Sequence, residues 1–122
     1  MMTEFHKLYQ QQMEFQEHLL SKGVYEGVGG ETKLPTDNPK VESYHIQQLI
    51  SEIGEVLDAD KRWKSFRNGK CDLENKKEEI ADCFIVLMNV AMFSGFTADD
   101  ILRSVENKIK TNNERIKMKY EE

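Results

Sequence analysis

The chain has 122 residues, a length typical of one domain, and 39% of them are hydrophobic. The formal charge of −5 argues against a general nucleic-acid binder, because such proteins need a basic surface to contact phosphates. No secretion signal is apparent, no stretch reaches the ~20 apolar residues of a membrane span, and two cysteines make no disulfide scaffold. We therefore expect a single domain over residues 1–122, in a soluble cytoplasmic protein that binds neither nucleic acid nor membrane.

Apolar residues recur at helical spacing throughout the chain, which predicts an all-α fold. The first helix is expected over residues 3–21, before a loop that contains most of the glycines and both prolines. The second begins after Asn38-Pro39, a capping residue followed by proline at the first helical position, and its apolar pattern reaches Trp63 and Phe66. The third is expected over residues 72–95. The fourth is capped by Thr97 and has a basic last turn.

The third helix is apolar on every face. All residues from Cys83 to Met88 are apolar, and four more apolar residues follow Asn89. A helix of this kind is buried on all sides, and three other helices from so short a chain can hardly surround it. We therefore expect the chain to form a homo-oligomer through this helix, most simply a twofold dimer. A site for a different partner protein is the alternative.

Two pairs of acids lie three residues apart, Glu52 with Glu55 and Glu79 with Asp82, which places each pair on one helical face. Both pairs border apolar surface, where a carboxylate is costly unless a cation compensates it. Oxygen ligands without a nearby His or Cys suit Mg²⁺ or Mn²⁺, and such ions assist attack on phosphorus. Metal binding and surface ion pairing are both open from the residues alone. A third such pair, at Glu14 and 17, is interpreted as solvated.

The fourth helix carries a polar stripe in which Lys108, Asn112, Arg115 and Lys119 recur at spacings of four, three and four. A Lys and an Arg on one face can hold a phosphate, the Arg through its planar fork. The alternative is a basic helix end that complements the helix dipole. Asn89 lies two turns beyond Asp82 on the same face and is a candidate either for sugar or base contact or for a hydrogen bond across a dimer.

With its second acid pair about two dozen residues after the first, the sequence resembles the all-α nucleoside triphosphate pyrophosphohydrolases, which include MazG-like enzymes and dimeric dUTPases. The resemblance covers about residues 40–120 and implies a four-helix MazG-like bundle that works as a homodimer or homotetramer. It implies a Mg²⁺-dependent enzyme, with Mn²⁺ as a substitute, that converts a (d)NTP to the monophosphate and pyrophosphate. dUTP is one candidate substrate. The implied catalytic and metal-binding residues are Glu52, Glu55, Glu79 and Asp82.

Finer similarities point toward the dUTPase branch. Trp63-Lys64 follows the first acid pair where that branch has an aromatic–Lys element, the polar stripe of the fourth helix is similar to its phosphate-binding pattern, and Gln12 matches a base-reading Gln. Packing in the core remains the preferred interpretation of Trp63. Ile85 stands where that branch often has His, and the chain is short, so a compact MazG-like enzyme is favoured. The candidate substrate-binding residues are Gln12, Trp63, Lys64, Asn89, Lys108, Asn112 and Arg115.

A function of a different class also fits the sequence. In this alternative the chain is a non-catalytic helical adaptor that uses the apolar third helix to engage another protein, and the acids are surface charge. The adaptor predicts no turnover and no change of stability with metal. It gives no reason for acids on the second and third helices to accompany cations on the fourth.

Overall fold

The computed structural model describes residues 2–28, 33–64 and 71–120, and in these ranges it is all-α. The four helices are α1 (Glu4–Ser21), α2 (Pro39–Ala59), α3 (Leu73–Phe93) and α4 (Ala98–Tyr120), with a short 3₁₀ helix η1 (Lys61–Trp63) after α2. The described ranges contain no strand, only two isolated β-bridges. The predicted all-α, four-helix fold is therefore confirmed. No helix in these ranges is long and apolar enough to cross a membrane.

The helix starts follow the capping residues in the sequence. The side chain of Asn38 accepts a hydrogen bond from the backbone N–H of Val41, and Pro39 opens α2. Thr97 and Asp100 form a reciprocal pair at the start of α4, in which each side chain accepts from the other's backbone N–H. These contacts satisfy N–H groups that the first turn of a helix leaves without partners.

The second helix is shorter than predicted. It ends at Ala59, and Asp60 takes an extended backbone conformation. The Asp60 carboxylate accepts from the backbone and guanidinium N–H groups of Arg62 and from Lys76 Nζ of α3, so it stabilises a turn at this point. The apolar pattern that continues to Trp63 therefore does not continue the helix, and Phe66 lies outside the described residues.

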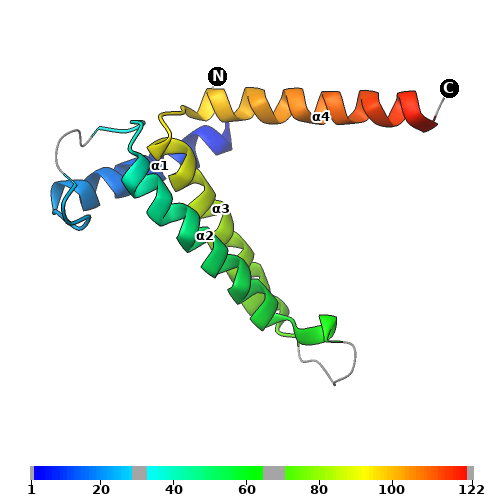
Figure 1. Cartoon of the computed structure of the whole chain (residues 1–122), viewed down its shortest axis with the longest axis horizontal. Helices are drawn as coiled ribbons and strands as arrows, with labels where there is room; N and C mark the ends of the chain where they lie inside the picture. The colour runs from blue at the N-terminus through cyan, green and yellow to red at the C-terminus, as the bar shows by residue number, and fades with distance from the viewer. Residues whose placement is uncertain (1, 29–32, 65–70, 121–122) are drawn as a thin grey trace.

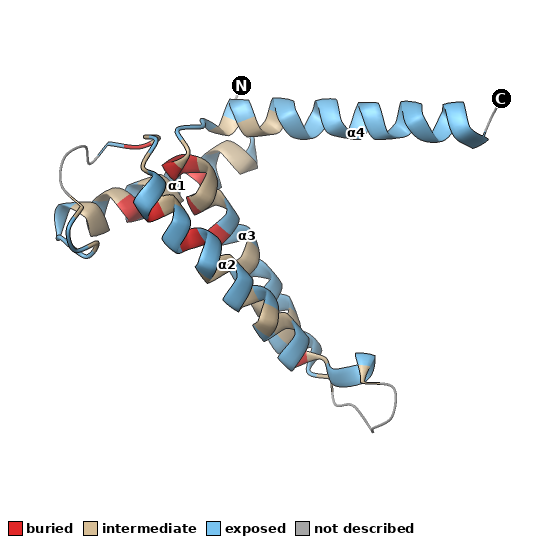
Figure 2. Ribbon diagram, viewed as in Figure 1, coloured by how far each residue is buried: buried red, intermediate tan, exposed pale blue. Residues whose placement is uncertain are grey.

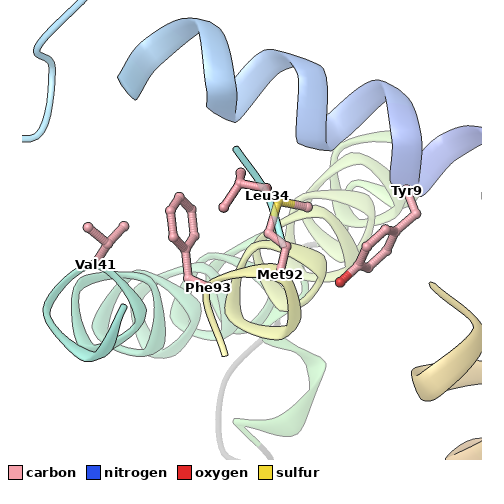
Figure 3. Packing of buried hydrophobic residues seen from close by; sticks show 5 residues of the cluster. All are labelled: Tyr9, Leu34, Val41, Met92 and Phe93. Atoms are coloured by element: carbon pink, nitrogen blue, oxygen red, sulfur yellow. The ribbon is translucent and has the colours of Figure 1, made fainter. Parts of the chain in front are cut away.

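The helices α2 and α3 form a long antiparallel hairpin, and α1 crosses α3 near the end of the hairpin that is farther from η1 (Figure 1). The buried core lies at this crossing, as Figure 2 shows. Five side chains form it: Tyr9, Leu34, Val41, Met92 and Phe93 (Figure 3). The four predicted site acids, Glu52, Glu55, Glu79 and Asp82, lie along α2 and α3 between this core and the turn at Asp60.

Much apolar surface remains uncovered in the single chain. On α3 the side chains of Phe84 and Leu87 are 67% and 52% exposed, and on α2 that of Ile50 is 67% exposed. The fourth helix projects away from the hairpin and is exposed along nearly its whole length (Figure 2). The other three helices therefore leave much of α3 uncovered, which agrees with the expectation from the sequence.

Candidate metal centre

Three of the four predicted acids meet in the middle of the hairpin. Glu52 comes from α2, and Glu79 and Asp82 come from successive turns of α3. One carboxylate oxygen of each lies within 4.8 Å of those of the other two. The spacing of three within each pair, together with the antiparallel pairing of the two helices, brings these residues together.

Glu55, the fourth predicted acid, does not belong to this close group. It is exposed one turn farther along α2, and it is near enough that its charge acts on Glu79. The third acid pair is also outside the group. Its Glu17 accepts a hydrogen bond from the backbone N–H of Leu34 at 2.9 Å. This carboxylate therefore binds the connection between α1 and α2 and is not simply solvated, as the sequence had suggested.

The cluster is strongly acidic. Partial burial raises the pKa of the Glu79 carboxyl, and the charges of Asp82, Glu55 and Glu52 raise it further, in that order. None of the ion pairs among the described residues joins a Lys or Arg to the three clustered carboxylates. A divalent cation would relieve this repulsion, and an all-carboxylate donor set suits Mg²⁺ or Mn²⁺. The residues present therefore fit a hard divalent ion.

Two neighbours of the cluster were not predicted. Gln48, one turn before Glu52, donates from Nε2 to Glu52 Oε1 at 2.9 Å. Its spacing of four residues before a predicted ligand is the signal that could have identified it. The other neighbour is Cys83, so the expectation that no cysteine lies near the acids is wrong.

The thiol of Cys83 does not add a soft ligand to the site. Burial raises its pKa, and the charges of Glu52, Asp82 and Glu79 raise it further. A thiol that stays protonated is a poor metal ligand, because the thiolate is the binding form. The chemistry of the donor set therefore remains that of oxygen.

Gln12 and Asn89, two candidate substrate-binding residues, contact each other. Gln12 Nε2 donates to Asn89 Oδ1 at 2.9 Å, where α1 crosses α3. Asn89 is buried, and its Nδ2 lies 3.5 Å from Nδ1 of the buried His45. The Asn89 amide therefore has its hydrogen-bond partners within its own chain, which is neither of the two contacts considered from the sequence.

The chain of polar contacts continues beyond His45. Its Nε2 lies 3.0 Å from the Tyr25 hydroxyl, and that hydroxyl donates to Gln16 Oε1. Because the Tyr25 proton is used on Gln16, His45 Nε2 must donate to the Tyr25 oxygen, and Nδ1 is left to accept from Asn89. These contacts fix one tautomer of a neutral imidazole.

Trp63 and Lys64 lie beyond the end of α2. The Trp63 side chain is 58% exposed, so the expected packing of this residue in the core is wrong. Its Nε1 donates to the Leu57 carbonyl at 3.2 Å, and Lys64 Nζ lies 5.2 Å from the centre of its ring. The pair forms a cationic and aromatic surface close to the hairpin turn.

The predicted phosphate-binding residues of α4 do not meet the acids in the single chain. Lys108 and Asn112 line an apolar groove of about 580 Å³ between α1, α3 and α4. Arg115 lies farther along the exposed half of α4, which points away from the hairpin (Figure 1). A single copy of the chain therefore holds the acids and these cations apart.

Most of the chain is similar to one known protein family. Residues 41–116 match the family model of the MazG nucleotide pyrophosphohydrolase domain. The match covers more than half of the chain, including nearly all of α2, all of α3 and most of α4, with all four predicted acids. No curated protein and no solved structure gave a match.

Proposed function

The chain belongs to the MazG nucleotide pyrophosphohydrolase family, and we propose that it is a Mg²⁺-dependent enzyme that hydrolyses (d)NTPs to the monophosphate and pyrophosphate. The meeting of Glu52, Glu79 and Asp82 inside the matched region carries this proposal. Nucleotide pyrophosphohydrolysis follows from the family itself. We propose the identity of the metal, the range of substrates and the role of each residue.

Each carboxylate has a role in this reaction. Glu52, Glu79 and Asp82 would hold the divalent ion, which when bound supplies charge neutralisation for the phosphates and an activated water. Water adds to the α or the β phosphorus and the α–β anhydride bond breaks. The phosphate group that is not attacked leaves with the electron pair of that bond, so the products are the monophosphate and pyrophosphate in either case. Glu55, exposed next to the cluster, is the candidate to orient the water and accept its proton.

We also propose that the active species is a homo-oligomer, either a dimer or a dimer of dimers. The uncovered side chains recur at helical spacing along one stripe of α2 (Ile46, Ile50, Ile53 and Leu57) and one stripe of α3 (Ile80, Phe84 and Leu87). A second copy of the chain would cover them. It would also offer its own α4 cations, which the acids of one copy lack. The canonical dNTPs, NTPs and dUTP are the candidate substrates, and Trp63 and Lys64 are candidate contacts for them.

Product analysis tests the reaction directly. The full chain is incubated with a panel of canonical dNTPs, NTPs and dUTP, with and without Mg²⁺, and the nucleotide and phosphate products are separated. Monophosphate and pyrophosphate that form only with Mg²⁺ are expected. Glu52→Gln should abolish turnover with the helical content retained, because it removes one clustered carboxylate charge.

A matched control is available on α1. Glu14 is exposed in the third acid pair, outside the cluster, so Glu14→Gln should leave turnover unchanged. Full activity of Glu52→Gln would overturn the site assignment. No turnover of any substrate, combined with no effect of Mg²⁺ on thermal stability, would favour the adaptor.

A further inference from the structure

Gln48 supplies a hydrogen bond to a cluster that is otherwise made of carboxylates. Its Nε2 donates to Glu52 Oε1 at 2.9 Å, and both side chains are half-buried on the same face of α2. Within the part of the chain that the structure describes, no other side-chain hydrogen bond or ion pair reaches Glu52, Glu79 or Asp82.

This contact answers a physical difficulty of the cluster. Three carboxylates within 4.8 Å repel one another, and a Glu side chain can rotate away from its neighbours. A cationic donor would hold Glu52 in place but would also cancel the charge that attracts a metal. The amide of Gln48 is neutral, so it fixes the carboxylate through one oxygen and leaves the negative charge and the second oxygen available.

The chain contains a comparable pair that lacks the surrounding acids. Gln10 Nε2 donates to Glu14 Oε1 at 3.2 Å on α1, with the same spacing of four residues and with both side chains exposed. Such a contact between residues four apart is an ordinary one on a helix surface. A comparison of substitutions in the two pairs therefore distinguishes an ordinary helix contact from a role in the acidic cluster.

We propose that Gln48 is a positioning residue, which holds the Glu52 carboxylate in the orientation that a divalent cation requires. The inference rests on the proposed function, because it assumes that Glu52, Glu79 and Asp82 bind a metal. Hydrogen-bond partners of metal ligands typically change metal affinity by about 10–100-fold when they are removed.

The test uses Mn²⁺ alone as the probe, without nucleotide. Mn²⁺ is titrated into the full chain, and free Mn²⁺ is followed by electron paramagnetic resonance. Gln48→Met keeps the length of the side chain and removes the amide, and it is expected to weaken Mn²⁺ binding about 10–100-fold. Gln48→Asn shortens the side chain by one methylene, which withdraws the amide from Glu52, and it should also weaken Mn²⁺ binding. Gln10→Met is the matched control and should bind as the unaltered chain does.

A second measurement distinguishes orientation from general damage. In Gln48→Met the Mg²⁺ concentration for half-maximal activity should rise, while kcat at saturating Mg²⁺ stays close to that of the unaltered chain. Loss of kcat at every Mg²⁺ concentration would indicate a structural role and overturn the inference. Equal Mn²⁺ affinity of Gln48→Met and the unaltered chain, or equal weakening in Gln10→Met, would also overturn it. If the unaltered chain binds no Mn²⁺, the metal centre itself is wrong and the inference is overturned with it.

Discussion

The buried imidazole of His45 makes the stability of the fold depend on pH. The residue is 4% exposed and stacks on Phe93 with ring centres 5.4 Å apart. Burial lowers the pKa of His45 from an ordinary 6.5 to about 4. A proton on Nδ1 would also face the Asn89 amide hydrogens, so the charged form loses a hydrogen bond as well as its hydration.

The sign and size of the effect follow from these values. As the pH falls below 6.5, the unfolded chain takes up the proton before the folded chain does, so the free energy of unfolding decreases until the pH approaches 4. Between about pH 7.5 and about pH 5 this one group should remove about 2 kcal/mol of stability. The contribution is fully present above pH 6.5 and is lost on acidification.

Urea unfolding followed by circular dichroism, at one protein concentration and several pH values, measures this loss. Carboxylates also titrate in this range, so the comparison is with His45→Gln, which lacks the imidazole and keeps a polar side chain. The stability of the unaltered chain should fall by about 2 kcal/mol more than that of His45→Gln between about pH 7.5 and about pH 5. Parallel pH profiles of the two proteins would refute the assignment of a buried neutral imidazole.

Three substitutions test the packing around the core. Tyr9→Phe removes the hydroxyl that donates to the Phe96 carbonyl, and it should lower the free energy of unfolding in urea by about 1–3 kcal/mol. A loss below the error of the measurement would contradict a stabilising role for this part-buried hydrogen bond. Gly95→Ala should lower the free energy of unfolding by about 1–2 kcal/mol, because Gly95 has a φ of +88° and a new Cβ would lie 3.4 Å from the Asp37 backbone nitrogen. An unchanged urea midpoint would rule out this strain. Met92→Ala should lower the free energy of unfolding by about 2–5 kcal/mol, since Met92 is fully buried, and a loss well under this range would mean that the site collapses around the smaller side chain.

The elements that depend on local chemistry could be predicted from the sequence. Asn38-Pro39 and Thr97 marked the helix starts correctly, because capping involves residues within one turn of each other. The end of α2 could not be predicted in the same way. It depends on Asp60, whose carboxylate contacts Lys76 of α3, and a contact between helices has no signature in the apolar pattern of one of them.

The same distinction applies to the candidate site. Spacing put Glu79 and Asp82 on one face, and the pairing of two helices added Glu52. Which acid would stay outside the close group was not predictable, because it depends on how the hairpin helices are rotated about their axes. The mutual contact of Gln12 and Asn89 was equally hidden, since it needs the crossing of α1 over α3.

The projecting helix α4 is, in mechanical terms, a cantilever. It is 23 residues long, or about 35 Å, and joins the hairpin through a single corner that includes Gly95. Its base is supported by Ala98, which packs against the core, and by two hydrogen bonds, the Tyr9 hydroxyl on the Phe96 carbonyl and His6 Nε2 with Asp99 Oδ1 at 2.6 Å. A rotation of about 10° at this corner would move the far end by about 6 Å, twice the length of a hydrogen bond. Any precise contact made by the last turns of α4 therefore requires a second point of support beyond the base.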